Sequence, residues 1–285
     1  MGTINLHYDG EFVVNNKISL MVLSRSLDGM QSALNRAYLD LKYKDGVWKW
    51  AKLPSQDYNN VQYYISEIKG GSFQIKFERS LQWGNELIDR LRGAIDPIYS
   101  ASEKGVENSL KIRTAVLDKR KLYEVGALSS TPFEVFRDTF NKDAEKRKFG
   151  DRSIAKEIDQ AVSVVRPKSV GESKLQLTLE GSQRNDYLFD RAKSIAFHSA
   201  VSARSLGDPV IYTGKLESLD RRTNKGKFVN FETKRPSILH FEDEPMLQLV
   251  RDYLGRESVT FLGAPLFEYS SYDPNSGDIY FLKLL

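Results

Sequence analysis

The sequence contains no cysteine, few histidines and no long apolar run. Without cysteine the chain has no disulfide, no thiolate metal site, no iron–sulfur cluster and no cysteine nucleophile, a composition consistent with a reducing compartment. No stretch approaches the roughly 18 apolar residues that indicate a membrane span. The N-terminal segment has neither the basic region nor the apolar core of a secretory signal. We therefore expect a cytoplasmic protein that makes no contact with a membrane.

The three histidines, His7, His198 and His240, are isolated in the sequence, with no HxH or HExxH spacing. A metal site or a Ser/His/Asp triad would have to be assembled entirely by tertiary folding. The dipeptide Gly214-Lys215 lacks the upstream glycine and the following Ser or Thr of a phosphate-binding loop, and no GxGxxG pattern occurs. We therefore predict no metal site and no cofactor.

Charge and length indicate an ordinary folded protein with more than one compact unit. The chain has 285 residues, 28% of them charged, and a formal net charge of +4. This length favours two or three units. By direct count, residues 101–168 carry fifteen Lys and Arg against eleven Asp and Glu, whereas residues 205–285 carry ten against twelve. The basic excess therefore lies in the middle of the chain.

Residues 1–82 predict an α+β domain in which a helix packs on an antiparallel sheet. Short strands are expected at 3–8 and 11–14. Apolar residues then recur three and four apart from Leu20 to Leu41, the spacing that places one face of a helix on a core. Two further strands, at 61–68 and 73–77, are joined through a Gly-Gly pair that suits a tight hairpin turn.

Residues 83–204 predict a mainly helical connector. We expect helices at 85–95, ending before Pro97, and at 103–123. Thr131 is placed to cap a third helix that ends at Gly150. Asp151 would cap the next helix, which ends before Pro167. A short strand at 174–179 and a helix at 186–199 complete this part.

Residues 205–285 predict a small five-stranded β-barrel. Three strands, a helix and two strands follow one another, which is the order of the OB-fold. The expected strands are 209–219, 227–232, 237–241, 258–269 and 278–285. In the stretch "FEDEP", Asp243 and Glu244 are better explained as residues that cap the helix than as metal ligands.

One pattern suggests a Mg²⁺-dependent nuclease of the PD-(D/E)xK type. Asp57, Glu67 and Lys69 have the required order, in which two carboxylates hold the metal and a lysine on the same strand face activates water. The same residues also fit a strand that leaves the core and enters a solvated turn. The pattern contains only three common residues, so the nuclease is kept as an alternative.

The predicted barrel offers cations and aromatic rings in the two loops that flank the ligand face of an OB-fold. The first loop carries Arg221, Arg222, Lys225 and Lys227, and the second carries Phe267, Tyr269 and Tyr272. Cations that contact phosphates, together with aromatic rings that stack on bases, are typical of single-strand nucleic-acid binding. The same aromatic rings would also suit the core of a barrel.

A resemblance adds biological context. The stretches "DGEFVVNNKISLMVLSRSLDGMQSAL", "ISEIKGGSFQIKFE", "YTGKLESLD" and "VTFLGAPLFEY" resemble uncharacterised bacterial proteins of mobile and antiviral-defence islands. The resemblance implies no catalytic residues and leaves the biochemical role open.

The combined prediction is a non-catalytic binding or adaptor protein that engages nucleic acid or a protein partner, in the context of antiviral defence. The first alternative is the nuclease with Asp57, Glu67 and Lys69. The second alternative is a structural subunit that assembles into a homo-oligomer through its long helix and sheet edges.

Overall fold

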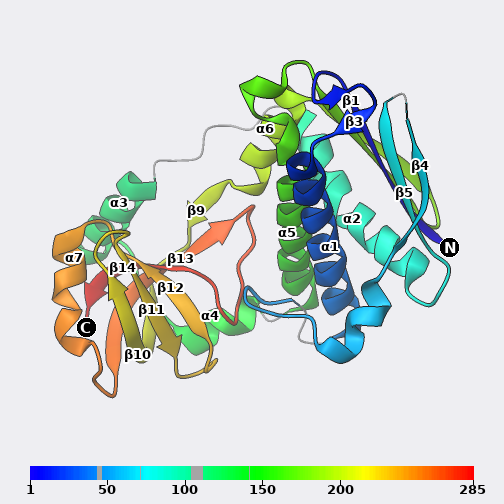
Figure 1. Cartoon of the computed structure of the whole chain (residues 1–285). Coiled ribbons are helices and arrows are strands. Elements are labelled where there is room, and N and C mark those ends of the chain that lie inside the picture. The colour runs from blue at the N-terminus through cyan, green and yellow to red at the C-terminus, as the bar shows by residue number, and fades with distance from the viewer. Residues whose placement is uncertain (44–46, 71, 104–111, 141) are drawn as a thin grey trace. The chain divides into compact units, whose positions relative to one another are not determined.

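The computed structural model describes residues 1–43, 47–70, 72–103, 112–140 and 142–285 (Figure 1). The chain forms two compact units, and both are discontinuous in sequence. Unit 1 comprises residues 1–47, 51–107 and 150–202, and unit 2 comprises residues 48–50, 108–149 and 203–285. The segment 83–204, predicted as one connector, is thus divided between both units.

Unit 1 contains a five-stranded sheet in which all neighbouring strands are antiparallel, in the order β4-β5-β1-β7-β8. The strands are β1 (Gly2–Asp9), β4 (Tyr64–Lys69), β5 (Phe73–Arg79), β7 (Lys174–Glu180) and β8 (Arg184–Phe189). A small hairpin of β2 (Val13–Val14) and β3 (Lys17–Ile18) follows β1. The order β4-β5-β1-β7, with helices after β1 and β5, is the split β-α-β arrangement.

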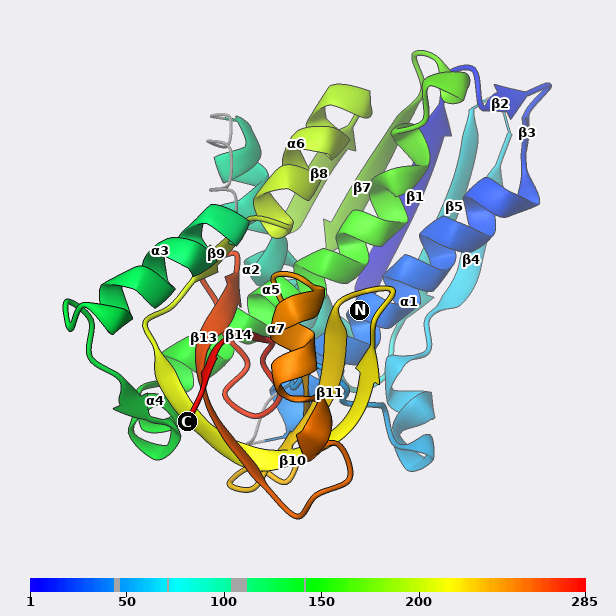
Figure 2. The same cartoon turned by 90° about the vertical axis from the view of Figure 1, so that its left-hand side faces the viewer.

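Helices cover one face of this sheet (Figures 1 and 2). They are α1 (Leu20–Lys42), α2 (Gly84–Glu103), the part of α5 (Asp143–Val162) that belongs to unit 1, and α6 (Arg191–Val201). Alternate residues of the central strand, Ile4, Leu6 and Tyr8, are fully buried on the covered face. The predicted antiparallel sheet and its covering helix are therefore confirmed.

Helix α1 follows the predicted apolar spacing. Ser19 accepts a hydrogen bond from the backbone N–H of Val22 and so satisfies one of the free donors at the helix start. Met30, Leu34 and Tyr38, which lie three and four apart, are buried along the face that packs on the core.

Three predicted helix boundaries are wrong. Pro97 lies inside α2, because Ile95 and Ile98 on either side of it are completely buried and the packing outweighs the lost backbone hydrogen bond. Gly150 and Asp151 lie inside α5, so neither ends nor caps a helix. A Cβ atom at Gly150 would lie 2.4 Å from Asp40 Oδ1, which explains a glycine within a continuous helix.

Two other segments also differ from prediction. Residues 184–189 form strand β8, which pairs with β7, and helix α6 begins after Asp190, whose side chain accepts a hydrogen bond from the Lys193 N–H. Thr131 and Pro132 form the short strand β6 (Thr131–Pro132), which pairs with β10, so helix α4 (Phe133–Phe140) begins without a Thr131 cap. Gly71 and residues 104–111, which carry parts of the predicted hairpin and helix, lie outside the described residues.

Unit 2 contains a closed five-stranded barrel, with a strand order of β10-β11-β12-β14-β13 and closure by the pairing of β13 with β10. The strands are β10 (Val210–Asp220), β11 (Lys225–Asn230), β12 (Pro236–His240), β13 (Val259–Glu268) and β14 (Ile279–Leu284). Strands β12 and β14 are parallel, and the other barrel pairs are antiparallel. The predicted five-stranded barrel is confirmed, and β9 (Arg204–Leu206) extends it next to β13.

Three helices accompany the barrel. Helix α7 (Glu244–Leu249) lies between β12 and β13, and Asp243 caps it by accepting from the Met246 N–H, as predicted. Helix α4 contributes Phe133 to the barrel core, and helix α3 (Ile112–Glu124) contributes Val116 to a second cluster with Leu262 and Leu282. Among the described residues, no helix has the length and apolar character needed to cross a bilayer.

Candidate functional sites

The predicted nuclease residues lie in different surroundings. Asp57 is buried in the 3₁₀ helix η1 (Ser55–Val61) and contacts the end of α1: it forms an ion pair with Lys42 and accepts hydrogen bonds from the hydroxyls of Tyr43 (2.6 Å) and Tyr38 (3.1 Å). Glu67 and Lys69 lie on β4, where the whole strand is exposed, and pair with each other at 3.1 Å. The structure records no contact between Asp57 and this pair.

The partners of Asp57 explain its electrostatics. The hydrogen bonds from Lys42 and then from Tyr43 lower the pKa of the Asp57 carboxyl below its ordinary value. The same interaction raises the pKa of Lys42. Through these contacts the Asp57 carboxylate holds η1 against the C-terminal end of α1. In the described part of the chain, no group of three or more histidine, aspartate or glutamate side chains is arranged to hold a metal ion.

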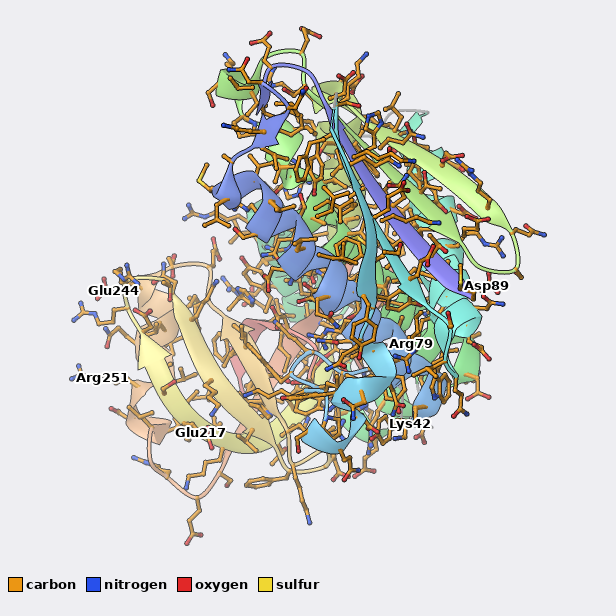
Figure 3. The ribbon with its side chains drawn as sticks, turned by 45° about the vertical axis from the view of Figure 1, so that its right-hand side comes forward. Lys42, Arg79, Asp89, Glu217, Glu244 and Arg251 are labelled. Atoms are coloured by element: carbon orange, nitrogen blue, oxygen red, sulfur yellow. The ribbon has the colours of Figure 1, made fainter. Side chains whose placement is uncertain are left out.

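The predicted cations of the barrel lie on an exposed hairpin between β10 and β11. Arg221 pairs with Glu244 of α7, and Lys227 pairs with Glu217 of β10 at 2.7 Å. Both glutamates are labelled in Figure 3. Arg222 and Lys225 are exposed and form no ion pair within the described residues, although the charge of Arg222, after the hydrogen bond from Thr223, helps to lower the pKa of the nearby Asp220. These two cations are therefore the ones most available to a ligand.

The predicted aromatic residues of the second loop lie mainly in the interior. Tyr272 is 3% exposed, and its ring lies 5.5 Å from Phe267 and 5.2 Å from Phe136 of helix α4. Phe267 also lies 5.3 Å from Phe140. Tyr269 follows β13 in the left-handed backbone region and is partly exposed. The rings of Phe267 and Tyr272 thus pack α4 on the barrel, and the buried ring of Tyr272 presents no open stacking surface.

Residues 48–50 bind to the loop between β13 and β14. The Lys49 N–H donates to Asp273 at 2.7 Å, and Lys49 Nζ pairs with Asp278, which also contacts His240 at 3.1 Å. Burial alone would raise the pKa of Asp278, but the contacts with His240 and Lys49 outweigh it and lower that pKa. The guanidinium of Arg235 lies 4.6 Å from the ring of Trp48. This side of the barrel is therefore occupied by the chain itself.

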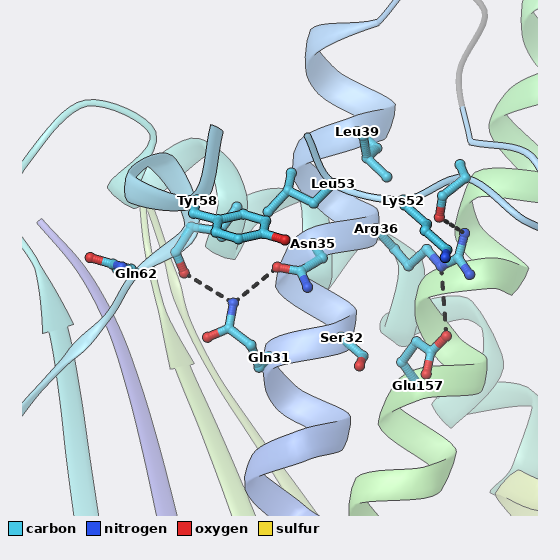
Figure 4. A pocket seen from close by; sticks show the side chains of 12 residues that line it. Gln31, Ser32, Asn35, Arg36, Leu39, Lys52, Leu53, Tyr58, Gln62 and Glu157 are labelled. Carbon is cyan, nitrogen blue, oxygen red and sulfur yellow. Dashed lines mark hydrogen bonds and ion pairs between the residues drawn. The ribbon is translucent and has the colours of Figure 1, made fainter. Parts of the chain in front are cut away.

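Unit 1 contains a polar cleft of about 550 Å³ between α1, η1 and α5 (Figure 4). Its walls comprise the helix residues Gln31, Ser32, Asn35, Arg36, Leu39 and Glu157 and the residues Ala51, Lys52, Leu53, Tyr58, Val61 and Gln62. The amide groups of Gln31 and Asn35 are joined at 3.0 Å, and Gln31 also donates to the Val61 carbonyl. Arg36 lies 3.6 Å from Glu157 and donates to the Ala51 carbonyl.

Buried arginines hold the walls of this cleft in place. Arg79, at the end of β5, donates to the carbonyls of Asn59 and Gln62, both at 2.8 Å, and so fixes η1 (Figure 3). Arg90 of α2 pairs with Asp40 of α1 at 2.6 Å and with Asp151 of α5. The two helices that face the cleft are thereby joined through one guanidinium.

This cleft could not be identified from the sequence. Gln31, Asn35 and Arg36 are visible there only as polar positions between the apolar residues of α1, and Glu157 lies more than a hundred residues away in sequence. The local sequence pattern that points to the cleft is the pair of amide residues Gln31 and Asn35, which lie four apart and therefore on the same side of the helix.

Comparisons with known proteins give no match: no family model fits the chain, and neither does a curated protein or a solved structure. Function is therefore inferred from geometry and chemistry.

Proposed function

We propose that this chain is a nucleic-acid-binding protein whose barrel is OB-like and contacts the phosphate backbone through the β10–β11 hairpin. The observation that carries the proposal is the barrel's connectivity. Three antiparallel strands, a helix and two strands close as β10-β11-β12-β14-β13, with β12 parallel to β14. This is the strand sequence of barrels that bind oligonucleotides over their second and third strands.

The charges on the second barrel strand support the same surface. Along β11, Gly226, Phe228 and Asn230 are buried, whereas Lys225 and Lys227 face outward. Arg222 lies in the exposed turn between β10 and β11. Phosphate contacts by such cations supply most non-specific affinity for nucleic acid and depend strongly on salt.

The part of the barrel around the loop between β13 and β14 is a poorer candidate for the ligand-binding site. The loop between β13 and β14 already holds residues 48–50, and Phe267 and Tyr272 pack against α4. We therefore propose that the protein binds the phosphate backbone of the nucleic acid and does not stack on its bases. Antiviral defence, the context implied by the resemblance, remains part of this proposal, whereas the nuclease alternative gains no support from the placement of Asp57.

The test is fluorescence anisotropy with labelled single-stranded and double-stranded DNA and RNA over a range of salt. The double variant Arg222→Gln/Lys225→Gln should weaken binding uniformly across sequences and reduce the salt slope by about one for each phosphate that is no longer neutralised. The double variant Arg251→Gln/Lys283→Gln removes the same charge from other exposed positions of unit 2 and should bind like the parent. Absence of binding at low salt, or unchanged binding after neutralising Arg221, Arg222, Lys225 and Lys227 together, would refute the proposal.

One observation favours a second candidate, the homo-oligomeric subunit. Strand β4 lies at the sheet edge, and its residues Tyr64, Ile65 and Ile68 are 62%, 56% and 59% exposed. Exposed apolar edge strands are templates for pairing with another chain. Antiparallel pairing of two copies about Ile68 would place Glu67 of each opposite Lys69 of the other.

Light scattering tests this second candidate. Assembly predicts a mass of at least twice the 32.5 kDa of one chain. Ile68→Lys should return the mass to that of one chain. A single-chain mass at all concentrations excludes the assembly.

A further inference from the structure

The polar cleft of unit 1 has the size and the chemistry of a small-molecule site. Its volume of about 550 Å³ falls within the range of roughly 300–1,000 Å³ that is usual for ligand pockets. Eight of the twelve lining residues carry a polar group on the side chain, and apolar atoms, including those of Leu39 and Leu53, form slightly more than half of the lining surface. The cleft lies far in sequence from the barrel hairpin and uses none of its residues.

The polar groups are divided into two kinds. In Figure 4, the amides of Gln31 and Gln62 lie with Tyr58 on one side, whereas Arg36 and Lys52 lie with Glu157 on the other. One side therefore presents hydrogen-bonding edges beside an aromatic ring, and the other side presents two cations and one carboxylate.

The amide side retains hydrogen-bonding capacity. Gln31 uses its Nε2 group for both Asn35 and the Val61 carbonyl. Within the described residues, Gln31 Oε1 and Asn35 Nδ2 have no recorded partner, which leaves one acceptor and one donor. Paired donors and acceptors on Asn and Gln suit the edge of a purine base.

Tyr58 supplies a flat surface at the mouth of the cleft. Tyr58 is 54% exposed although it lies on η1, whose residues Asp57 and Val61 are buried. An exposed aromatic side chain on a rigidly held turn is suited to stacking on a planar ring. Arg79 holds this turn by its bonds to the carbonyls of Asn59 and Gln62.

The charged side favours an anion. Arg36 is balanced by Glu157 at 3.6 Å, whereas Lys52 is exposed and has no recorded partner in the described part of the chain. The cleft therefore carries a surplus positive charge at Lys52, where it can meet a phosphate.

We propose that this cleft binds a purine nucleoside monophosphate, with the base between Tyr58 and the amides of Gln31 and Asn35 and the phosphate at Lys52 and Arg36. Binding here is independent of the nucleic-acid binding proposed for the barrel.

Isothermal titration calorimetry of the full chain tests the proposal with AMP, GMP, CMP and UMP, and with adenosine and inorganic phosphate as the separate parts. A purine monophosphate should bind more tightly than a pyrimidine monophosphate and more tightly than either part alone. Tyr58→Leu should weaken AMP or GMP binding by about 5- to 150-fold, the range expected for one stacked base, whereas Tyr58→Phe should retain it.

Lys52→Gln should weaken binding of the purine monophosphate but leave adenosine binding unchanged. Lys168→Gln, which removes another exposed lysine of unit 1, should change neither the affinity for the monophosphate nor the affinity for adenosine. Circular dichroism checks that each variant is folded. No heat with any monophosphate at millimolar concentration, or equal binding by Tyr58→Leu and the parent, would overturn the proposal. Arg222→Gln/Lys225→Gln should bind the nucleotide normally, so the failure of one site does not imply failure of the other.

Discussion

Arg90 is a buried cation that joins α1, α2 and α5 in unit 1. Its side chain is only 1% exposed and pairs with Asp40, which is 6% exposed, and with Asp151. Removing one member of a buried ion pair leaves an uncompensated charge in a region of low dielectric constant. We expect Arg90→Met to lower the free energy of unfolding by about 3–5 kcal/mol, measured by urea denaturation.

Arg92, on the same helix, is the matched control. It lies 3.6 Å from Asp89 in a pair that remains partly exposed. Arg92→Met should therefore cost at most about 1 kcal/mol. Equal effects of both substitutions would show that the Arg90 cluster adds nothing beyond a surface ion pair.

Asp57 makes the stability of the protein depend on pH. Hydrogen bonds from Lys42 and Tyr43 lower its pKa in the folded chain, so its contribution is fully present at neutral pH. The contribution is lost as the pH falls through that lowered value. We expect Asp57→Asn to be destabilised at neutral pH, and the difference from the parent to shrink in acid. Urea unfolding at a series of pH values measures this difference, and a difference that is constant with pH would contradict the assignment.

At the scale of elements, the crossing of α1 and α5 requires a very close approach. A Cβ atom on Gly29 would lie 2.6 Å from the backbone nitrogen of Ala161, and Ser26 Oγ donates to the Ala161 carbonyl at 3.1 Å. Gly29→Ala gains about 1 kcal/mol of helix propensity but causes overpacking that costs about 1–3 kcal/mol. We expect a net fall in thermal stability. Asp28→Ala, on the exposed side of α1, should not cause this fall, and a stabilised Gly29→Ala would show that the helices move apart easily.

Most elements could be predicted from sequence because their signals are local. The spacing of Met30, Leu34 and Tyr38 identifies α1, and the turn residues between alternating segments identify the barrel strands. Pro97 and Gly150 misled the prediction because tertiary packing decided both positions. A helix can continue through a glycine when the residues after it are buried in the core. Ile154 and Ile158, which follow Gly150 in α5, are completely buried.

At the scale of the whole molecule, the sites depend on pairings that no local pattern reveals. The cations of the β10–β11 hairpin could be predicted, since they follow directly from a turn between two strands. The internal position of Tyr272 could not, because it depends on Phe136 and Phe140 from a helix more than a hundred residues earlier. The cleft likewise needs Arg36 of α1 to meet Glu157 of α5.

The same long-range packing determines what can fold alone. Val116 packs on Leu262 and Leu282, and Phe133 lies 5.2 Å from the buried ring of Tyr212. A fragment of residues 203–285 contains all five barrel strands but would expose these apolar surfaces. We expect this fragment to bind the dye ANS and to lack near-ultraviolet circular dichroism. Addition of a peptide of residues 112–140 should restore both properties toward those of the full chain, whereas a peptide of the same length in which Val116 and Phe133 are replaced by serine should not. Cooperative unfolding of the fragment alone would show that the barrel core is complete without α3 and α4.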